Sequence, residues 1–137
     1  MSLADKITRE KMYANDKFSQ WLGIEILETG LGKSKLRMTV RKEMTNGMGI
    51  AHGGISYSLA DSCFAFASNS HGRIAVSIET SISHTAKVNV GDVLTAEATQ
   101  LSSSYKTAIY SIEVTNQDNR VIGLFKGTVY ISSKEWV

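Results

Sequence analysis

The stretch Thr45–Asn69, TNGMGIAHGGISYSLADSCFAFASN, decides the fold. Its first part, Thr45–Gly54, holds four glycines in ten residues, which indicates a loop with special backbone geometry. Apolar side chains then recur at helical spacing, at Ile55, Leu59, Cys63, Phe66 and Ala67. Further apolar side chains widen this surface around most of the circumference, at Tyr57, Ala60 and Phe64. A helix that is apolar on so many sides is usually buried, so we expect a long central helix at Ile55–Asn69.

Upstream of the loop, the sequence predicts one helix and two strands. Ser2–Asp5 has the pattern of a capping box, which opens a helix that should run to about Asn15. A short strand is expected around Ile24–Leu27. In Lys35–Arg41 apolar and polar residues alternate with a period of two, which is typical of a strand with one wet face.

Downstream of the central helix, alternation predicts four further strands. They should form an antiparallel meander of hairpins, with one hairpin loop at Asn116–Asn119. The last strand, Val121–Ser132, contains Gly123 and Gly127, which mark bulges or close approach of the backbone. We therefore predict an α+β fold in which an antiparallel sheet wraps around the long helix. One sheet around one helix leaves apolar strand surface uncovered, so a homo-oligomer is expected.

Composition limits the class of protein. The 137 residues suit a single domain spanning 1–137, and 42% apolar with 20% charged residues is an ordinary globular balance. A net charge of +2 is too small to indicate nucleic-acid binding. No apolar run approaches ~18 residues, and the N-terminus lacks a signal-peptide core, so no membrane association is expected. The single cysteine, Cys63, excludes an internal disulfide and favours a cytoplasmic location.

The junction of loop and helix is a candidate site for acyl transfer. Gly53 and Gly54 fall where the helix begins, and the first turn of a helix carries unpaired N–H groups and a positive dipole end. Glycines let a ligand carbonyl approach that backbone closely, as in an oxyanion hole. The alternative is that these glycines only make a tight turn.

Three polar residues surround this junction. Asp61 lies two turns into the helix, where it is either a solvated residue or a partly buried base or nucleophile whose pKa burial would raise. His52 either locks the loop by a hydrogen bond or takes part in catalysis, and Asn46 can donate to a carbonyl or orient a water. No metal site is expected, because His52, His71 and His84 lack ligand spacing and Cys63 lies on the apolar stripe.

The segment Asn46–Gly54, NGMGIAHGG, followed by Ser58–Asp61, SLAD, resembles the signature of hotdog-fold acyl-CoA thioesterases. It is most similar to the phenylacetic-acid-degradation group, and the resemblance extends over roughly Phe18–Ile131. It implies a hotdog fold, thioester hydrolysis without metal or redox cofactor, and homodimers that pair into a homotetramer. Rival readings are a module that binds acyl-CoA without cleaving it and a dehydratase acting on hydroxyacyl thioesters.

The resemblance also implies roles for individual residues. Asn46 and the backbone N–H of Gly53 would polarise the thioester carbonyl, and His52 would shape that site. Asp61 would act as general base or nucleophile from across the dimer interface, and the hydroxyl of Ser77 would help to place the attacking water.

The acyl group is not readable from the sequence. Aromatic and long apolar side chains would either line an aryl or medium-chain acyl pocket or belong to the core; these are Phe18, Trp21, Met48 and Tyr57. Gly54 is expected to lie against the substrate. The family often has a proline after the strand that follows the helix, whereas this chain has Thr85–Val88. There Lys87 either contacts a CoA phosphate or is simply solvated.

Overall fold

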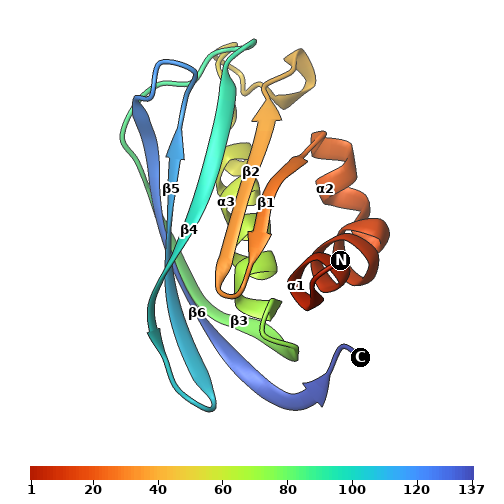
Figure 1. Ribbon diagram of the computed structural model, residues 1–137. Coiled ribbons are helices and arrows are strands. Elements are labelled where there is room, and N and C mark those ends of the chain that lie inside the picture. The colour runs from red at the N-terminus through yellow and green to blue at the C-terminus, as the bar shows by residue number, and fades with distance from the viewer.

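A six-stranded antiparallel sheet curves around one long helix in the computed structural model, which describes residues 1–137 (Figure 1). The helix is α3 (Gly53–Asn69), and its apolar surface faces the strands as predicted. The strands are β1 (Glu25–Gly30), β2 (Lys33–Thr39), β3 (Arg73–His84), β4 (Val93–Ser103), β5 (Thr107–Thr115) and β6 (Val121–Glu135). The α+β arrangement of a sheet wrapped around a central helix is thereby confirmed.

The order of strands in the sheet is β1-β2-β4-β5-β6-β3. The predicted meander is correct for β4, β5 and β6, but wrong for β3, which pairs with β6 at the far edge instead of with β4. The register runs from Arg73 opposite Glu135 to His84 opposite Gly123. Alternation in a sequence shows which face of a strand is buried, but it does not identify the neighbouring strand. The second edge of β3 is left without a partner strand within the chain.

Close packing between α3 and β6 explains one of the two glycines in the last strand. A Cβ atom added to Gly127 would stand 2.6 Å from Cζ of Phe64, well inside van der Waals contact. Phe64 also packs edge-on against Tyr110 and tilted against Phe125, so its ring has no room to withdraw. The predicted close backbone approach is therefore confirmed at Gly127.

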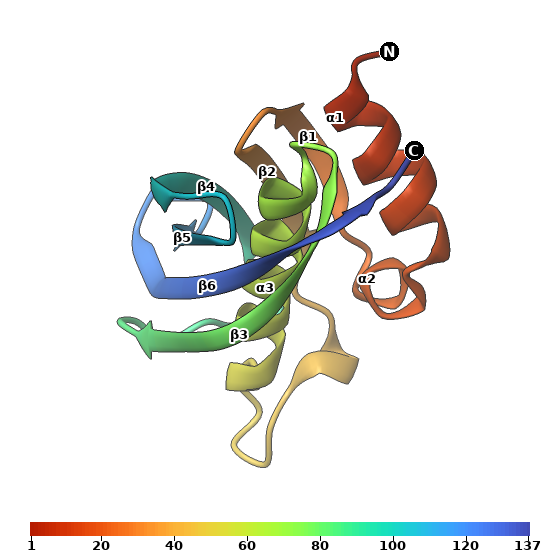
Figure 2. The same cartoon turned by 90° about the horizontal axis from the view of Figure 1, so that it is seen from below.

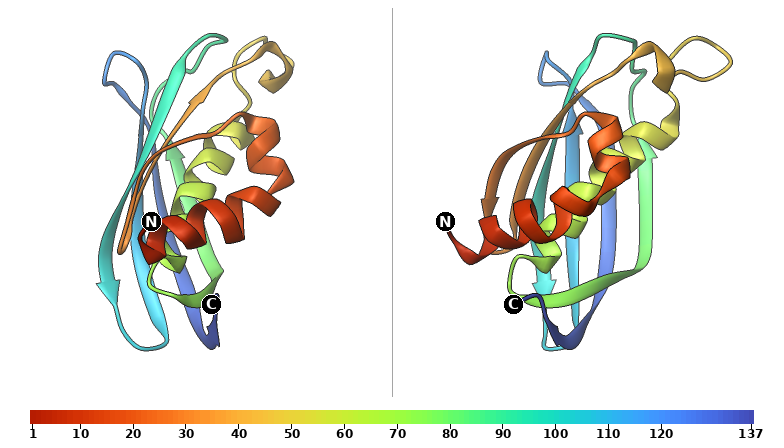
Figure 3. Two further views of the ribbon diagram at one scale, coloured as in Figure 1. Left: turned by 45° about the vertical axis from the view of Figure 1, so that its right-hand side comes forward. Right: turned by 90° about the vertical axis from the view of Figure 1, so that its right-hand side faces the viewer.

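Helical segments at the N-terminus cover the side of α3 that the sheet leaves open (Figures 2 and 3). They are α1 (Leu3–Asp5), the π-helical η1 (Lys6–Met12), η2 (Tyr13–Asn15) and α2 (Lys17–Leu22). The predicted cap is present, because the Asp5 amide donates to the Ser2 hydroxyl at 3.1 Å. Alternation did not indicate α2, since only Ser19 and Leu22 of this short helix are buried.

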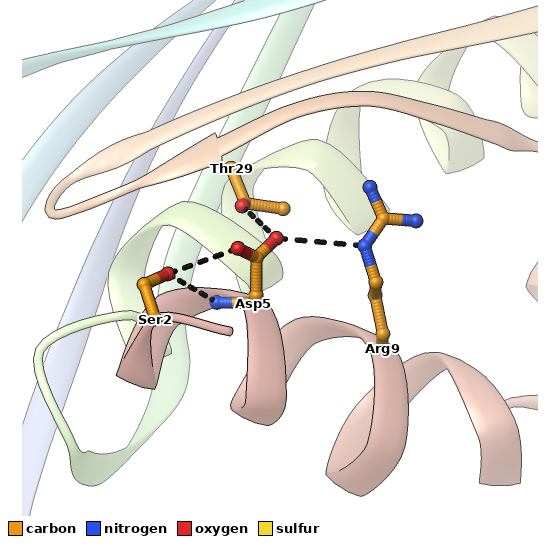
Figure 4. A network of polar contacts seen from close by, with 4 residues as sticks. All are labelled: Ser2, Asp5, Arg9 and Thr29. Atoms are coloured by element: carbon orange, nitrogen blue, oxygen red, sulfur yellow. Dashed lines mark hydrogen bonds and ion pairs between the residues drawn. The ribbon is translucent and has the colours of Figure 1, made fainter.

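Asp5 anchors the first turn of this N-terminal segment to the sheet (Figure 4). Its carboxylate accepts hydrogen bonds from Thr29 of β1, from Ser2 and from Arg9. The bond from Thr29 is the main reason, ahead of that from Ser2, why the pKa of Asp5 is lowered from 3.8. The network joins the first helical turn to strand β1, at the opposite end of the segment from α2.

Candidate active site

The loop before α3 presents the side-chain amide of Asn46. The short helix η3 (Lys42–Met44) precedes this loop, and a tight turn closes where the Gly49 amide donates to the Asn46 carbonyl, with Gly49 at a left-handed φ of 78°. The Met48 amide donates to Oδ1 of Asn46 at 2.9 Å. Because this bond occupies the oxygen, the Nδ2 group of Asn46 is left to donate to another partner.

Two backbone bonds hold the end of this loop in place. The His52 amide donates to the carbonyl of Met44 at 2.8 Å, and the Ala51 amide donates to that of Val88 at 3.0 Å. The second bond joins the loop to the segment that follows β3. Lys87, which is exposed, is thus one residue from the contact between the two segments.

His52 caps α3, and the hydrogen bond of its ring is the loop-locking bond that was one of the two interpretations of this residue. It stands at the N-cap position, and its Nδ1 accepts a hydrogen bond from the Gly54 amide at 2.8 Å. The loop-locking bond is therefore present, and the neutral ring carries its proton on Nε2. The Gly54 amide is consumed by this bond. The Gly53 amide has no partner within the chain, so it is a free backbone donor at the start of α3.

Asp61 is placed on α3 two turns beyond Gly53. Its side chain is partly buried, and it takes part in no ion pair and accepts no side-chain hydrogen bond within the chain. Burial raises the pKa of Asp61 from 3.8, and the nearby negative charge of Asp16 raises it further. The predicted effect of burial on this carboxyl group is confirmed. A carboxylate of this kind is a stronger proton acceptor than a solvated one.

The remaining predicted residues lie in different environments. Ser77 is exposed on β3, and its hydroxyl makes no hydrogen bond within the chain. Tyr57 is tied down, because its hydroxyl is 2.6 Å from Oγ1 of Thr80 and its ring packs on Phe125. Met48 is 78% exposed on the turn of the loop. Of these, only Tyr57 is packed against the core.

Two aromatic side chains, for which the sequence allowed either a core position or a place in the acyl pocket, lie at the surface of the chain. Phe18 and Trp21 are 56% and 50% exposed, and their rings lie parallel at a centroid distance of 6.2 Å. The guanidinium of Arg41 lies 4.8 Å from the centre of the Trp21 ring. The core reading of Phe18 and Trp21 is therefore wrong for the single chain.

Sequence reasoning missed His84, which the fold brings to the start of α3. A Cβ atom on Gly53 would stand 3.2 Å from Nε2 of His84, and Nδ1 of His84 is 3.5 Å from Oγ of Ser56. His84 is the last residue of β3, and only the pairing of β3 with β6 places it there. Its position in the sequence offered no signal, because the neighbour of β3 could not be predicted.

The surface of a single chain does not enclose these residues. Its three hollows are lined elsewhere, and the largest, about 510 Å³, lies over polar residues of β2, β4 and β5. No group of three His, Cys, Asp or Glu side chains is arranged to hold a metal ion. No helix has both the length and the apolar character needed to cross a bilayer.

Comparison with known proteins identifies the family. The family model described as "Thioesterase superfamily" matches residues 48–122. A protein of Archaeoglobus fulgidus is 47% identical over 122 residues, covering 89% of this chain and 79% of that protein. The acyl-coenzyme A thioesterase PaaI of Escherichia coli is 40% identical over 116 residues, covering 85% of this chain and 83% of PaaI.

A solved structure of the E. coli PaaI protein, from the phenylacetic acid degradation operon, agrees over nearly the whole fold. The TM-score is 0.93 with 35% identity, and the match covers 98% of this chain and 97% of that one. The resemblance noted in the loop and helix is therefore confirmed. The chain belongs to the thioesterase superfamily, as a hotdog-fold enzyme similar to PaaI.

Proposed function

We propose that this protein hydrolyses acyl-CoA thioesters to the free acid and CoA, with the carbonyl oxygen bound by Gly53 and Asn46. The free Gly53 amide at the N-terminus of α3 carries the proposal. An amide at this position gains from the helix dipole, which favours negative charge on the bound oxygen. The Nδ2 group of Asn46 is the second donor, oriented by the bond from Met48 to its oxygen. The name of the E. coli relative, acyl-coenzyme A thioesterase, supports the choice of substrate class.

Asp61 supplies the base in this scheme. A water molecule attacks the carbonyl carbon while Asp61 takes its proton, and the oxyanion is stabilised by the two donors. The C–S bond then breaks, and the sulfur leaves as CoA thiol after it receives the proton. In the other form of the scheme, the Asp61 carboxylate attacks the carbonyl carbon, the C–S bond breaks to release CoA thiolate, and water cleaves the resulting anhydride, with a proton of that water passing to the thiolate. Ser77 orients the water, and His52 holds the carbonyl-binding loop.

The geometry of α3 supports a site built from two copies of the chain. Gly53 and Asp61 are eight residues apart on one helix, which separates them by about 12 Å along the axis. In the proposed homodimer, a carbonyl bound at Gly53 meets the Asp61 of the second copy. The unpaired edge of β3 supports such a homodimer, because Val76 and Ile78 on this strand are 53% and 60% exposed. Two such dimers would form the homotetramer, in the cytoplasm.

The substrate contacts follow from the same arrangement. Lys87 is exposed beside the loop, where its charge suits a phosphate of CoA, and Gly54 and Met48 flank the thioester. The exposed rings of Phe18 and Trp21 suit an aryl or medium-chain acyl group. The ring of Tyr57 contributes to the same acyl-binding site, and its hydroxyl is fixed by a hydrogen bond with Thr80.

A thiol-release screen over short, medium, long and aryl acyl-CoAs tests the proposal. The parent protein should release one CoA thiol per thioester, and Asp61→Asn should lose activity by a factor of ~10² or more. Asp118→Asn is the matched control, because it removes the same charge from the exposed hairpin loop after β5 and should leave the rate unchanged. Tight binding of acyl-CoA without thiol release by the parent would overturn hydrolysis in favour of a binding module.

A further inference from the structure

A second carboxylate, Asp16, is held at a fixed place against the helix that carries Asp61. Asp16 is the N-cap of α2, and its Oδ1 accepts from the Ser19 amide at 3.0 Å. Its Oδ2 accepts from the Ser19 hydroxyl at 2.6 Å. Both carboxylate oxygens of Asp16 are therefore hydrogen-bonded to Ser19, and Ser19 is held in place because it is fully buried.

A hydroxyl pair extends this arrangement to α3. Oγ of Ser19 is 2.8 Å from Oγ of Ser62, the residue that follows Asp61. The hydroxyl proton of Ser19 is used toward Asp16, so Ser62 donates to Ser19. The contact holds α2 against α3 at the residue next to Asp61, and Asp16 stands at the start of α2.

No cation neutralises this pair within the chain. The ion pairs of the protein involve Asp5, Glu25 and Glu79, and none involves Asp16 or Asp61. The elements packed on α3 are η1, α2 and strands β2 to β6. Among their ionisable groups, only Asp16 acts on Asp61, whose pKa it raises in addition to the larger effect of burial. Two like charges held together without a counter-ion reduce stability, which points to a role in function.

We propose that Asp16 is a positioning residue whose fixed negative charge, held by Ser19 and Ser62, keeps Asp61 a strong proton acceptor. Asp16 does not touch the substrate in this scheme. It acts through Asp61 alone, so the inference rests on the proposed thioesterase function. With the charge in place, Asp61 takes the proton of the attacking water more readily, at the cost of needing a higher pH to become ionised.

The pH dependence of kcat/KM tests this role. Asp16→Asn removes the charge and keeps an oxygen for the cap, so α2 should remain folded. The acid limb of its profile should move to lower pH, while its plateau falls by less than about tenfold, because the base itself is retained. Asp118→Asn loses the same charge from the exposed hairpin loop after β5 and should keep the acid limb of the parent. Ser62→Ala keeps both charges but loses the hydroxyl contact between α2 and α3, so its acid limb should move part of the way toward that of Asp16→Asn.

An acid limb of Asp16→Asn that coincides with those of the parent and of Asp118→Asn would overturn the inference. If Asp16→Asn fails to fold, Asp16→Ser provides the same test, because serine is also a good N-cap without charge.

A titration of the Asp61 carboxyl carbon by NMR gives a second readout that does not depend on activity. Its midpoint should be lower in Asp16→Asn than in the parent, and equal midpoints would contradict the inference. If the parent cleaves no acyl-CoA, the proposed function fails, whereas this titration still decides whether Asp16 acts on Asp61.

Discussion

The imidazole of His52 accepts the hydrogen bond of the Gly54 amide at 2.8 Å, whereas the neighbouring Gly53 amide has no partner within the chain. Two adjacent amides at the start of α3 therefore differ, because one has a partner within the chain and the other has none. One completes the cap of α3, and the other is the donor that we propose for the substrate carbonyl. The stability of the helix and the geometry of the proposed carbonyl site thus depend on the same residue.

Replacement of His52 should therefore affect both properties. His52→Ala removes the cap and should lower the free energy of unfolding by about 1 kcal/mol, measured by urea denaturation. Thiol release should also fall, because the loop before Gly53 loses its anchor. His52→Asn keeps a cap acceptor and should recover most of the stability. Equal stability of the parent and the alanine variant would show that the cap contributes nothing.

The contact between Gly127 and Phe64 gives a prediction about packing. Gly127→Ala would place Cβ 2.6 Å from a ring that is held by its neighbours, so it should destabilise the fold by about 1–3 kcal/mol. Gly47→Ala is the control, because nothing lies within 4 Å of its Cβ position, and its stability should change by less than about 0.5 kcal/mol. Combining Gly127→Ala with Phe64→Leu should recover part of the loss. Chemical denaturation of the parent, the two single glycine variants and the double variant measures these differences in the free energy of unfolding.

The raised pKa of Asp61 predicts that its carboxylate reduces stability at neutral pH. Because the folded protein holds this proton more tightly than the unfolded chain, stability falls as pH rises from 3.8 through the higher folded pKa, and stays lower above it. Asp61→Asn should therefore be more stable than the parent at pH ~7, and the difference should vanish in acid. Urea unfolding at several pH values measures it. A variant that is less stable than the parent at neutral pH would contradict the sign.

Cys63 should be inert in the folded protein. Burial raises the pKa of its thiol to about 12, and the side chain is inaccessible among core residues. A thiol reagent should therefore detect no protein thiol before unfolding and one per chain after it. Rapid labelling of the native protein would show that the core opens. The prediction also means that a thiol-release assay carries no background from the enzyme.

The central helix and most strands were predictable because burial imposes a period on the sequence. Ile55 and Cys63 face the core at helical spacing, and Leu36 and Met38 do so at strand spacing. The neighbour of β3 was not predictable, since alternation contains no information on pairing. His84 was missed for that reason.

The candidate site was predictable to the extent that it lies on one continuous segment. Asn46, His52, Gly53 and Asp61 all fall on the loop and helix that the glycines identify. Asp16 was not predictable, because its approach to Asp61 depends on the packing of α2 on α3. Nothing in the spacing of Ser19 and Ser62 indicates that their hydroxyls meet.

The hydroxyl contact between Ser19 and Ser62 joins α3 to a segment that precedes residues 48–122, the part matched by the family model. If Asp16 acts as we propose, substitutions in that segment can retune the acidity at which the enzyme works and leave its carbonyl-binding loop untouched. Related proteins that differ in their first turns would then share one chemistry and yet suit compartments or hosts of different acidity.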